Sequence, residues 1–198
     1  MKRAKRIIVF LVALCITVWS FGTCLEAKAK KGTKNNPYSA YSWHKVNVYN
    51  MWGEYTGTVK IKMIDCKYGD DATSYLNSLS GENSEEWEEP GEWNPGKNKQ
   101  YIYMKFKIKC IKSDGEFWCG NIVDEIYNKK SNKRLNAAVV LEDAPDGTEN
   151  IANSGLYQGG ETTCVSIHVV KKGKGNTPVT FTVPTGYEKW SWFTTKNK

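Results

Sequence analysis

Alternating apolar and polar residues mark four segments of the chain as β-strands with one buried face. In each segment every second residue is apolar, and lysine, serine or threonine fills most of the positions between. A period of two residues is typical of a strand with one side on a core and the other in solvent. The four segments are residues 59–63, 102–110, 165–169 and 179–183.

Three weaker segments complete an all-β pattern. Residues 122–127, 135–141 and 190–194 are further candidate strands. About seven short strands with polar turns between them predict an antiparallel β-sandwich. One short helix is expected near residues 70–79, where Asp70 or Asp71 can cap its start. The expected buried residues are Ile102, Met104, Phe106, Ile108, Val165, Ile167, Val179, Phe181 and Val183.

The N-terminus has the order of features found in a secretory signal peptide. A basic start is followed by an apolar run at 7–21 and by Ala27-Lys28-Ala29, which matches a signal-peptidase site. We expect residues 1–29 to be cleaved, leaving a secreted protein without a membrane span. One alternative is a retained anchor, although the run is shorter than the roughly 20 residues that span a bilayer. The other is a lipid on Cys24, which the preceding Thr23 disfavours.

Removing this leader changes the charge of the chain. The full chain has 28 Lys and Arg against 21 Asp and Glu. The leader takes five basic residues and Glu26, which leaves 23 against 20, a net charge of +3. Arg134 is the one arginine beyond residue 29. Because proteins that read nucleic acid rely on arginine forks and a strongly basic surface, this composition argues against a nucleic-acid partner.

The rest of the chain fits one domain. Residues 30–43 begin with a stretch rich in Lys, Gly and Asn and are expected to be a flexible linker, so that the domain spans residues 44–198. Residues 82–92 carry a run of glutamates and are predicted to be an acidic loop. The loop could bind calcium or a basic partner, but it lacks the spacing of a calcium-binding loop, and a solvated loop is the usual outcome.

Four cysteines lie beyond the leader, at Cys66, Cys110, Cys119 and Cys164. In an exported protein four cysteines usually form two disulfides, and three pairings are open. Asp114-Gly115 is typical of a two-residue hairpin turn, which would place Cys110 opposite Cys119. We therefore favour Cys110–Cys119 with Cys66–Cys164. If the turn is instead a longer loop between sheets, Cys110 pairs elsewhere, and free buried thiols are a further alternative.

Several segments follow one another in an order known from one protein family. They are GTVKIKMIDCKYG with GDDATSYLNSL, the loop EPGEWNPGKNK before QYIYMKFKIKC, and the late strands GGETTCVSIHVVKKG and TPVTFTVPTGYEKWSW. Over residues 44–194 this order resembles the secreted immunoglobulin-like domains of unknown function common in lipoproteins of Gram-positive bacteria, similar in fold to the immunoprotective extracellular antigen. The resemblance implies an immunoglobulin-like sandwich and supplies no catalytic residue. The chain departs from the family in its four cysteines and in lacking a lipidation site.

Neither histidine lies in a catalytic pattern. His168 alternates with apolar residues in its strand and His44 lies near the linker, so both are expected to be partly exposed. A general base would need a nucleophile and an orienting carboxylate nearby, and no G-x-S-x-G motif occurs. No two cysteines have the spacing of zinc ligands. We therefore expect no catalytic residue, no cofactor and no metal.

Tryptophan is the residue type that points to binding. Trp87 and Trp93 fall in or beside the acidic loop, where a core position is not expected. Exposed aromatic side chains on a sandwich loop can stack on sugar rings or anchor a protein, and the alternative is that they fold back over the sheet. The sequence thus predicts a monomeric, non-enzymatic binding or interaction module of unknown ligand, with a protein or glycan partner at the cell surface. The alternative is a small secreted hydrolase, or an accessory or inhibitor protein, which would need His168 beside a carboxylate and a hydroxyl in a cleft.

Overall fold

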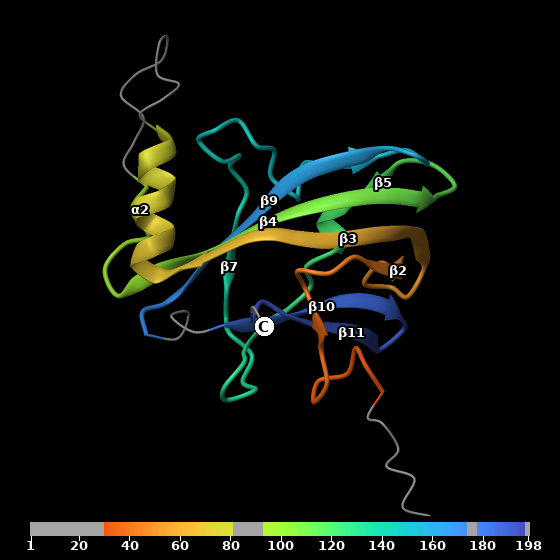
Figure 1. Cartoon of the computed structure of the whole chain (residues 1–198), viewed down its shortest axis with the longest axis horizontal. Coiled ribbons are helices and arrows are strands. Elements are labelled where there is room, and N and C mark those ends of the chain that lie inside the picture. The colour runs from red at the N-terminus through yellow and green to blue at the C-terminus, as the bar shows by residue number, and fades with distance from the viewer. Residues whose placement is uncertain (1–29, 81–92, 174–177, 197–198) are drawn as a thin grey trace, which may run out of the picture. The chain divides into compact units, whose positions relative to one another are not determined.

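The structure is a computed structural model that describes residues 30–80, 93–173 and 178–196. Lys31–Lys198 is one compact unit, built from two main β-sheets and one helix (Figure 1). The expected leader, the acidic loop 82–92 and Trp87 lie outside the described residues. Among the residues that are described, no helix is both long enough and apolar enough to cross a membrane.

The larger sheet has five strands in the order β2-β3-β4-β9-β7, and every neighbouring pair is antiparallel. These strands are β2 (His44–Tyr49), β3 (Tyr55–Tyr68), β4 (Lys99–Lys112), β9 (Glu161–Lys171) and β7 (Ala138–Val140). The predicted strand segments 59–63, 102–110 and 165–169 all lie inside this sheet, where alternation is strongest.

The smaller sheet has four strands in the order β1-β11-β10-β6, with β1 parallel to β11 and the other pairs antiparallel. These strands are β1 (Tyr38–Ser39), β11 (Lys189–Thr194), β10 (Val179–Gly186) and β6 (Ile126–Asn128). A separate pair is formed by β5 (Phe117–Trp118) and β8 (Gly155–Leu156), and a short 3-10 helix spans Cys119–Asn121. Two packed, mainly antiparallel sheets confirm the predicted β-sandwich.

Apolar side chains from both sheets fill the space between them. Phe106 of β4 packs edge-on against Phe181 of β10, with ring centroids 5.5 Å apart. Phe181 in turn stacks on Phe193 of β11 at 5.3 Å. Around these rings the core takes Val46, Val59, Ile61, Met63, Ile102, Met104, Ile108, Val179 and Val183.

The helix α2 (Gly69–Ser80) covers part of the outer face of the larger sheet, close to the predicted position. Ala72 and Leu76 are fully buried there, and they pack with Tyr103 and Val165 in a second apolar cluster. Tyr75 meets Tyr103 edge-on at 5.2 Å. Near the helix, β4 and β9 are therefore buried on both faces.

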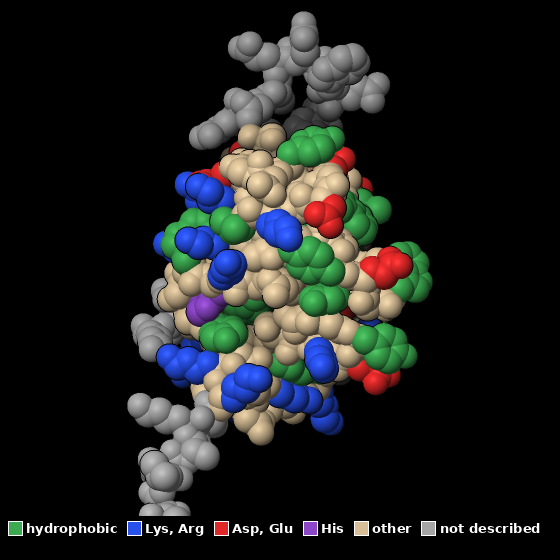
Figure 2. Space-filling view, turned by 90° about the vertical axis from the view of Figure 1, so that its right-hand side faces the viewer, with side chains coloured by type: hydrophobic (Ala, Val, Ile, Leu, Met, Phe, Trp, Pro, Cys, Tyr) green, Lys and Arg blue, Asp and Glu red, His purple; other side chains and the backbone are tan. Residues whose placement is uncertain are grey.

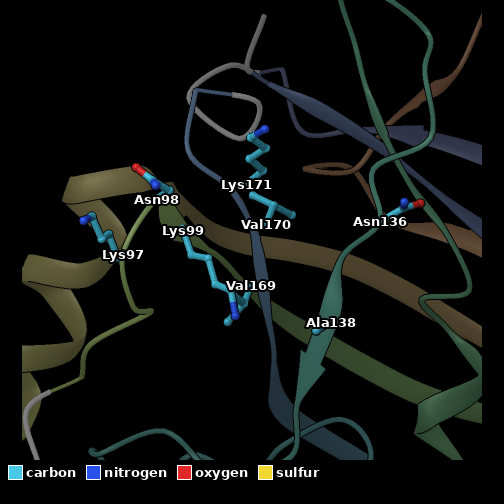
Figure 3. A pocket seen from close by; sticks show the side chains of 8 residues that line it. All are labelled: Lys97, Asn98, Lys99, Asn136, Ala138, Val169, Val170 and Lys171. Atoms are coloured by element: carbon cyan, nitrogen blue, oxygen red, sulfur yellow. The ribbon is translucent and has the colours of Figure 1, made fainter.

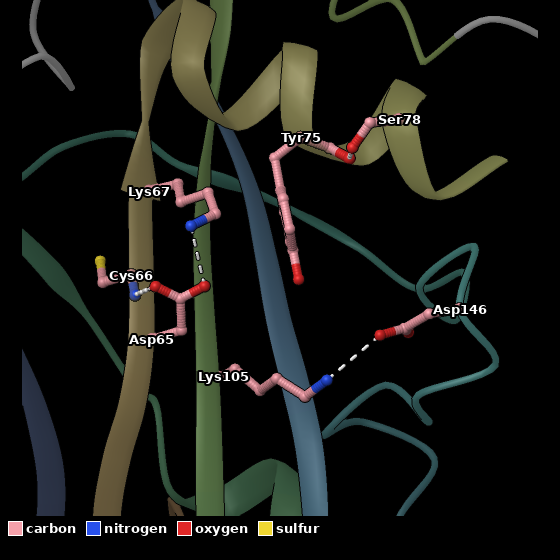
Figure 4. Close-up of polar contacts among 7 residues, drawn as sticks. All are labelled: Asp65, Cys66, Lys67, Tyr75, Ser78, Lys105 and Asp146. Atoms are coloured by element: carbon pink, nitrogen blue, oxygen red, sulfur yellow. Dashed lines mark hydrogen bonds and ion pairs between the residues drawn. The ribbon is translucent and has the colours of Figure 1, made fainter. Parts of the chain in front are cut away.

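Salt bridges border this second cluster (Figure 4). Lys67 pairs with Asp65 at 3.0 Å, and its ammonium lies 4.4 Å from the ring centroid of Tyr75. Lys105 of β4 pairs with Asp146 at 3.1 Å. The second pair ties the loop before β8 to the middle of the sheet.

The two faces of strand β9 are reversed relative to the prediction. The face that its alternation assigns to solvent packs in the sandwich core. All nine residues of the expected buried set are buried, but Val165 and Ile167 pack in the cluster under the helix. Cys164 and Val170, on the opposite face, belong to the core between the sheets. His168 has the same parity and is only 4% exposed, so the expected partly exposed position is wrong.

Residues 38–43 belong to the sandwich rather than to a flexible linker. β1 pairs with β11, and the buried Ala40 donates its N–H to the carbonyl of Thr194 at 2.9 Å. The carbonyl of Ala40 accepts from the N–H of Met63 at 2.8 Å, which joins the segment to the larger sheet. A two-residue strand and one buried alanine are too short to produce a recognisable period, which is why the sequence pattern does not show them.

Candidate functional site

Three aromatic side chains stand in a row on the outer face of the smaller sheet. Along β11, Trp190 and Trp192 alternate with Phe193, which points into the core, so both indoles point outward. Tyr127 of β6 lies beside Trp192, with ring centroids 4.7 Å apart. Tyr127, Trp190 and Trp192 are referred to below as the aromatic strip.

Neighbouring groups hold these rings in place. Trp190 is 42% exposed, and its indole N–H donates to Oδ2 of Asp124 at 2.8 Å. The backbone N–H of Trp192 donates to the carbonyl of Gly32 at 3.0 Å, so the segment before β1 runs beside β11. The ammonium of Lys34 lies 5.2 Å from the ring centroid of Tyr127 and 5.4 Å from that of Trp192. The strip is therefore ordered without any ligand.

Charged groups border the strip at fixed positions. Glu125 accepts a hydrogen bond from the Tyr127 hydroxyl and pairs with Arg134 at 2.6 Å. Burial, reinforced by the Glu125 carboxylate, raises the pKa of Tyr127 to about 12, so the hydroxyl keeps its proton at neutral pH. The backbone of Glu125 is fixed to β10, since its carbonyl accepts from Thr182 N–H at 3.0 Å. This edge of the strip offers carboxylate oxygens and guanidinium donors together.

A second group of exposed apolar side chains lies where two hairpin turns meet. Met51 and Trp52, in the β2–β3 turn, are 81% and 73% exposed, and Tyr187, in the β10–β11 turn, is 70% exposed. Asn50 fixes the first turn by accepting the N–H of Trp52 at 3.0 Å. A Cβ added at Gly53 would lie 3.0 Å from Cβ of Tyr187, so the two turns are in contact. Figure 2 shows hydrophobic side chains among charged groups at this end.

His168 and Ser166 form a hydroxyl–imidazole pair inside the sandwich core. Ser166 Oγ lies 2.7 Å from His168 Nε2, and His168 Nδ1 is buried without a hydrogen-bond partner in the described part of the chain. Burial lowers the pKa of His168 to about 4, so its ring is neutral at neutral pH. His44, half-buried, lies 2.9 Å from the carbonyl of Ser39. The pair thus lacks the orienting carboxylate and open cleft that the hydrolase alternative needs.

Trp93 folds back on the larger sheet. Its ring meets Tyr101 edge-on at 5.7 Å. Its backbone N–H donates to Oδ1 of Asn77 at 2.7 Å, and its carbonyl accepts from Nδ2 of the same side chain at 3.2 Å. Trp93 therefore helps to cover the sheet beside α2, the alternative that the sequence left open. A role of Trp93 in ligand contact stays a prediction.

The predicted pair Cys66–Cys164 is wrong in this strand register. Cys66, Cys110, Cys119 and Cys164 are all free thiols. Cys66 lies opposite Met104 of β4, which lies opposite Ser166 of β9, so a whole strand separates Cys66 from β9. Two strand spacings amount to about 10 Å, beyond the roughly 7 Å between Cα atoms that a disulfide tolerates.

The prediction of a two-residue hairpin between Cys110 and Cys119, on which their pairing is based, is also wrong. β5 pairs with β8, with Phe117 opposite Leu156, and not with β4. Cys110 N–H donates to the carbonyl of Gly160, and Cys119 N–H to that of Ser154, both at 2.9 Å. The turn at Asp114-Gly115 therefore connects β4 of the larger sheet to the separate pair β5–β8, and Phe117 is buried in the core. Within the described ranges, no three His, Cys, Asp or Glu side chains are grouped to hold a metal ion.

Sequence reasoning did not identify the aromatic strip. Residues 190–194 are a candidate strand by pattern, and the order Trp-Ser-Trp-Phe does place two tryptophans on one face. The pattern shows that the two tryptophans share a face of the strand, but it does not show whether another segment covers that face. Tyr127 joins the strip through the pairing of β6 with β10, a tertiary contact that leaves no local trace in the sequence.

Comparisons with known proteins give a distant structural likeness. No protein-family model matches the chain, and no curated protein matches it. Among solved structures, the chain is similar to an uncharacterized β-sandwich protein from Clostridium difficile, with 14% sequence identity and a TM-score of 0.47. The similarity covers 85% of this chain and 98% of that one. A likeness of this degree assigns neither a family nor a function.

Proposed function

We propose that the chain is a secreted, non-enzymatic binding module and that its aromatic strip binds a glycan. The observation that carries the proposal is the row of Trp190, Trp192 and Tyr127 on one outer sheet face. A sugar ring has an apolar C–H face that packs on an aromatic ring, and a rim of hydroxyls that needs polar partners. Asp124, Glu125 and the other charged groups along the strip can supply those partners.

The spacing of the rings favours a sugar chain over a single sugar. Alternate residues on a strand lie about 6.6 Å apart, so the exposed Trp190 and the partly buried Trp192 lie within reach of neighbouring sugar units, with Tyr127 beside Trp192. Because neighbouring groups already fix these rings, little side-chain freedom is lost on binding.

The charged border favours a glycan over a protein partner. Protein–protein interfaces are depleted of charged residues at their centre. Here Asp124 bonds the indole of Trp190, and Lys34 lies over Tyr127 and Trp192, so each ring has a charged neighbour. Charged groups beside the rings can exchange hydrogen bonds with the hydroxyls of a glycan.

A glycan array followed by calorimetry of the full-length chain tests this proposal. We expect Trp190→Ala combined with Trp192→Ala to weaken binding about tenfold or more, since each lost ring contact contributes roughly 1 kcal/mol. Trp43→Ala is the matched control, because Trp43 is similarly exposed at 44% but lies outside the strip. No glycan bound by the unchanged chain, or equal binding by the double variant, would refute the proposal.

The earlier candidates in the acidic loop are tested in the same assay. A Trp87→Ala, Trp93→Ala variant that binds as the unchanged chain does would remove Trp87 and Trp93 from the ligand contact. A loss of binding confined to that variant would move the site from the strip to the helix side of the sandwich.

Secretion is part of the proposal and has its own test. Expression in a Gram-positive host should release a protein whose first residue is Lys30, as read by mass spectrometry of the culture medium. A cell-bound product that keeps residues 1–29 would support the anchor, and an added lipid mass at Cys24 would support lipidation.

The immunoglobulin-like assignment is also a proposal. It is supported by two packed, mainly antiparallel sheets with hairpin turns gathered at one end. Against it, β2, β3 and β4 follow one another within one sheet, whereas immunoglobulin strands are divided between the sheets ABED and CFG.

We propose a monomer with a glycan at the cell surface as its partner and without a nucleic-acid partner. Gel filtration tests the oligomeric state, and an oligonucleotide titration tests the absence of nucleic-acid binding.

A further inference from the structure

A cavity of about 400 Å³ lies where β4 begins and β9 ends. Figure 3 shows Lys97 in the turn before β4, Lys99 at the start of β4 and Lys171 at the end of β9. Asn98 lies in the same turn, and Asn136 lies across from it on the segment before β7. Figure 3 also shows Lys99 extending along β9 beside Val169. The cavity has the volume of a small-ligand site.

The cavity exists because a connecting segment crosses between the two sheets. β7 pairs with β9 only over Ala138–Val140, opposite residues 167–169. Just before it, Leu135 belongs to the other sheet, since its N–H donates to the carbonyl of Ile126 at 2.8 Å. On the side away from β4, the end of β9 beyond Val169 has no strand beside it in the described part of the chain, which leaves room for a ligand.

Within the described residues, no acidic side chain neutralises the positive charge of the lining. Lys99 and Lys171 lie directly opposite each other in the β4–β9 register, an arrangement that is unfavourable for like charges. In the described part of the chain, Lys97, Lys99 and Lys171 form no ion pair, and no acidic residue lines the cavity. A second hollow of about 300 Å³ shares Asn136 and Lys171 and adds Arg134. The two hollows share lining residues and are referred to together below as the cationic groove.

The backbone that carries these lysines is fixed. Asn98 takes the left-handed conformation, with φ of 61°, and its carbonyl accepts the N–H of Lys172 at 2.8 Å. Lys99 N–H donates to the carbonyl of Gly96 at 3.1 Å. The positive groups thus project from an ordered turn, which lowers the cost of ordering them around an anion.

We propose that this cationic groove binds a chain of sugar or polyol units linked by phosphates. Ammonium groups act as point charges and suit tetrahedral phosphate, while the planar fork of an arginine suits a carboxylate as well. Asn98 and Asn136 can bond hydroxyls, and Val169 offers an apolar wall to carbon atoms. The adjoining hollows share Lys171, and Lys99 lines the larger one, so two neighbouring phosphates can each lie near an ammonium group. Arg134, in the smaller hollow, is already paired with Glu125. This site makes no use of the aromatic strip.

Calorimetry of the full-length chain with inorganic tripolyphosphate at low ionic strength tests the proposal. We expect Lys99→Gln with Lys171→Gln to weaken binding about tenfold or more, because two of the charges facing the phosphates are lost. The matched control is Lys45→Gln with Lys60→Gln, since these lysines also lie directly opposite each other, on β2 and β3. The control changes the net charge equally and should alter affinity less than about twofold.

A charge-preserving variant separates binding from folding. Lys99→Arg with Lys171→Arg should keep most of the affinity, and thermal unfolding shows whether each variant is folded. No binding by the unchanged chain, or equal losses in the groove and control variants, overturns the proposal. Binding of phosphatidylglycerol vesicles without binding of tripolyphosphate also overturns it, in favour of a membrane surface. The Trp190→Ala, Trp192→Ala variant should bind tripolyphosphate normally, so this test and the glycan test fail independently.

Discussion

His168 places an imidazole in an apolar core, which makes the stability of the fold depend on pH. Burial lowers its pKa from the ordinary histidine value of 6.5 to about 4. Between these values the unfolded chain binds a proton that the folded chain does not, so stability is full above pH 6.5 and falls as the pH is lowered. From pH 7 to pH 5 the expected loss is about 2 kcal/mol, at roughly 1.4 kcal/mol per pH unit.

Urea unfolding at the two pH values measures this loss. His168→Gln should remove most of the difference, because glutamine can keep a bond to Ser166 but does not titrate. His44→Gln is the control: burial also lowers the pKa of His44, but that ring is only half-buried. An unchanged pH dependence in the His168 variant would contradict a buried neutral imidazole.

The four cysteines are protected from alkylation by burial and by the high pKa of buried thiols. Burial raises the pKa of Cys66 and of Cys119 to about 12, and the thiolate is the reactive form. Cys110 and Cys164 are fully buried in the core, out of reach of a reagent. Iodoacetamide at pH 8 should therefore label none of the four rapidly in the folded chain. Unfolding without reductant should expose all four, as peptide mapping shows. Unlabelled Cys110 and Cys119 after unfolding would instead show that these two, which share the core, are joined.

At the scale of elements, helix α2 depends on its docking to the sheet. A helix of 12 residues is marginal by itself in water. Its stability comes from Ala72 and Leu76, which are buried against the outer face of β4 and β9. The two-sided burial of these strands depends in turn on the helix.

Leu76→Ala tests this mutual dependence. Removing a fully buried leucine side chain should lower the free energy of unfolding by about 2 to 4 kcal/mol, because a cavity is left beside Tyr103. Ser74→Ala, on the exposed side of the same helix, should change it by less than about 0.5 kcal/mol. Equal effects of the two substitutions, measured by urea unfolding, would show that the helix is not docked as described.

The same elements show what the sequence can and cannot predict. In β4 the alternating Ile102, Met104 and Phe106 face the core as predicted, since the other face has lysines over much of its length. In β9 the alternation correctly separates two faces but assigns them wrongly. Alternation shows which residues share a face, and what covers that face depends on a distant segment such as α2. For the same reason the pattern suggests the outward tryptophans of β11 but not Tyr127 beside them.

At the scale of the whole molecule, the two proposed sites belong to different sheets and are separable by mutation. The aromatic strip is carried by β11 and β6, whereas the cationic groove is carried by β4, β9 and the segment before β7. Arg134 lies between them, because it pairs with Glu125 beside the strip and also lines the smaller hollow. A glycan that carries phosphates could contact both surfaces, which is why each is tested with its own probe.

The folded unit begins before His44, because the segment that contains β1 packs on both sheets. A chain that starts at His44 loses the pairing of β1 with β11 and three further backbone hydrogen bonds, namely Ala40 N–H to Thr194, Met63 N–H to Ala40 and Trp192 N–H to Gly32. It also loses Tyr38, whose ring packs 5.5 Å from that of Phe193. At about 1 kcal/mol for each bond, a chain starting at His44 should be at least about 3 kcal/mol less stable than one starting at Lys30. Urea unfolding followed by tryptophan fluorescence compares the two. Equal stability would mean that residues 30–43 are a linker after all, while the predicted loss would show that the sandwich needs β1 to cover the edge of β11.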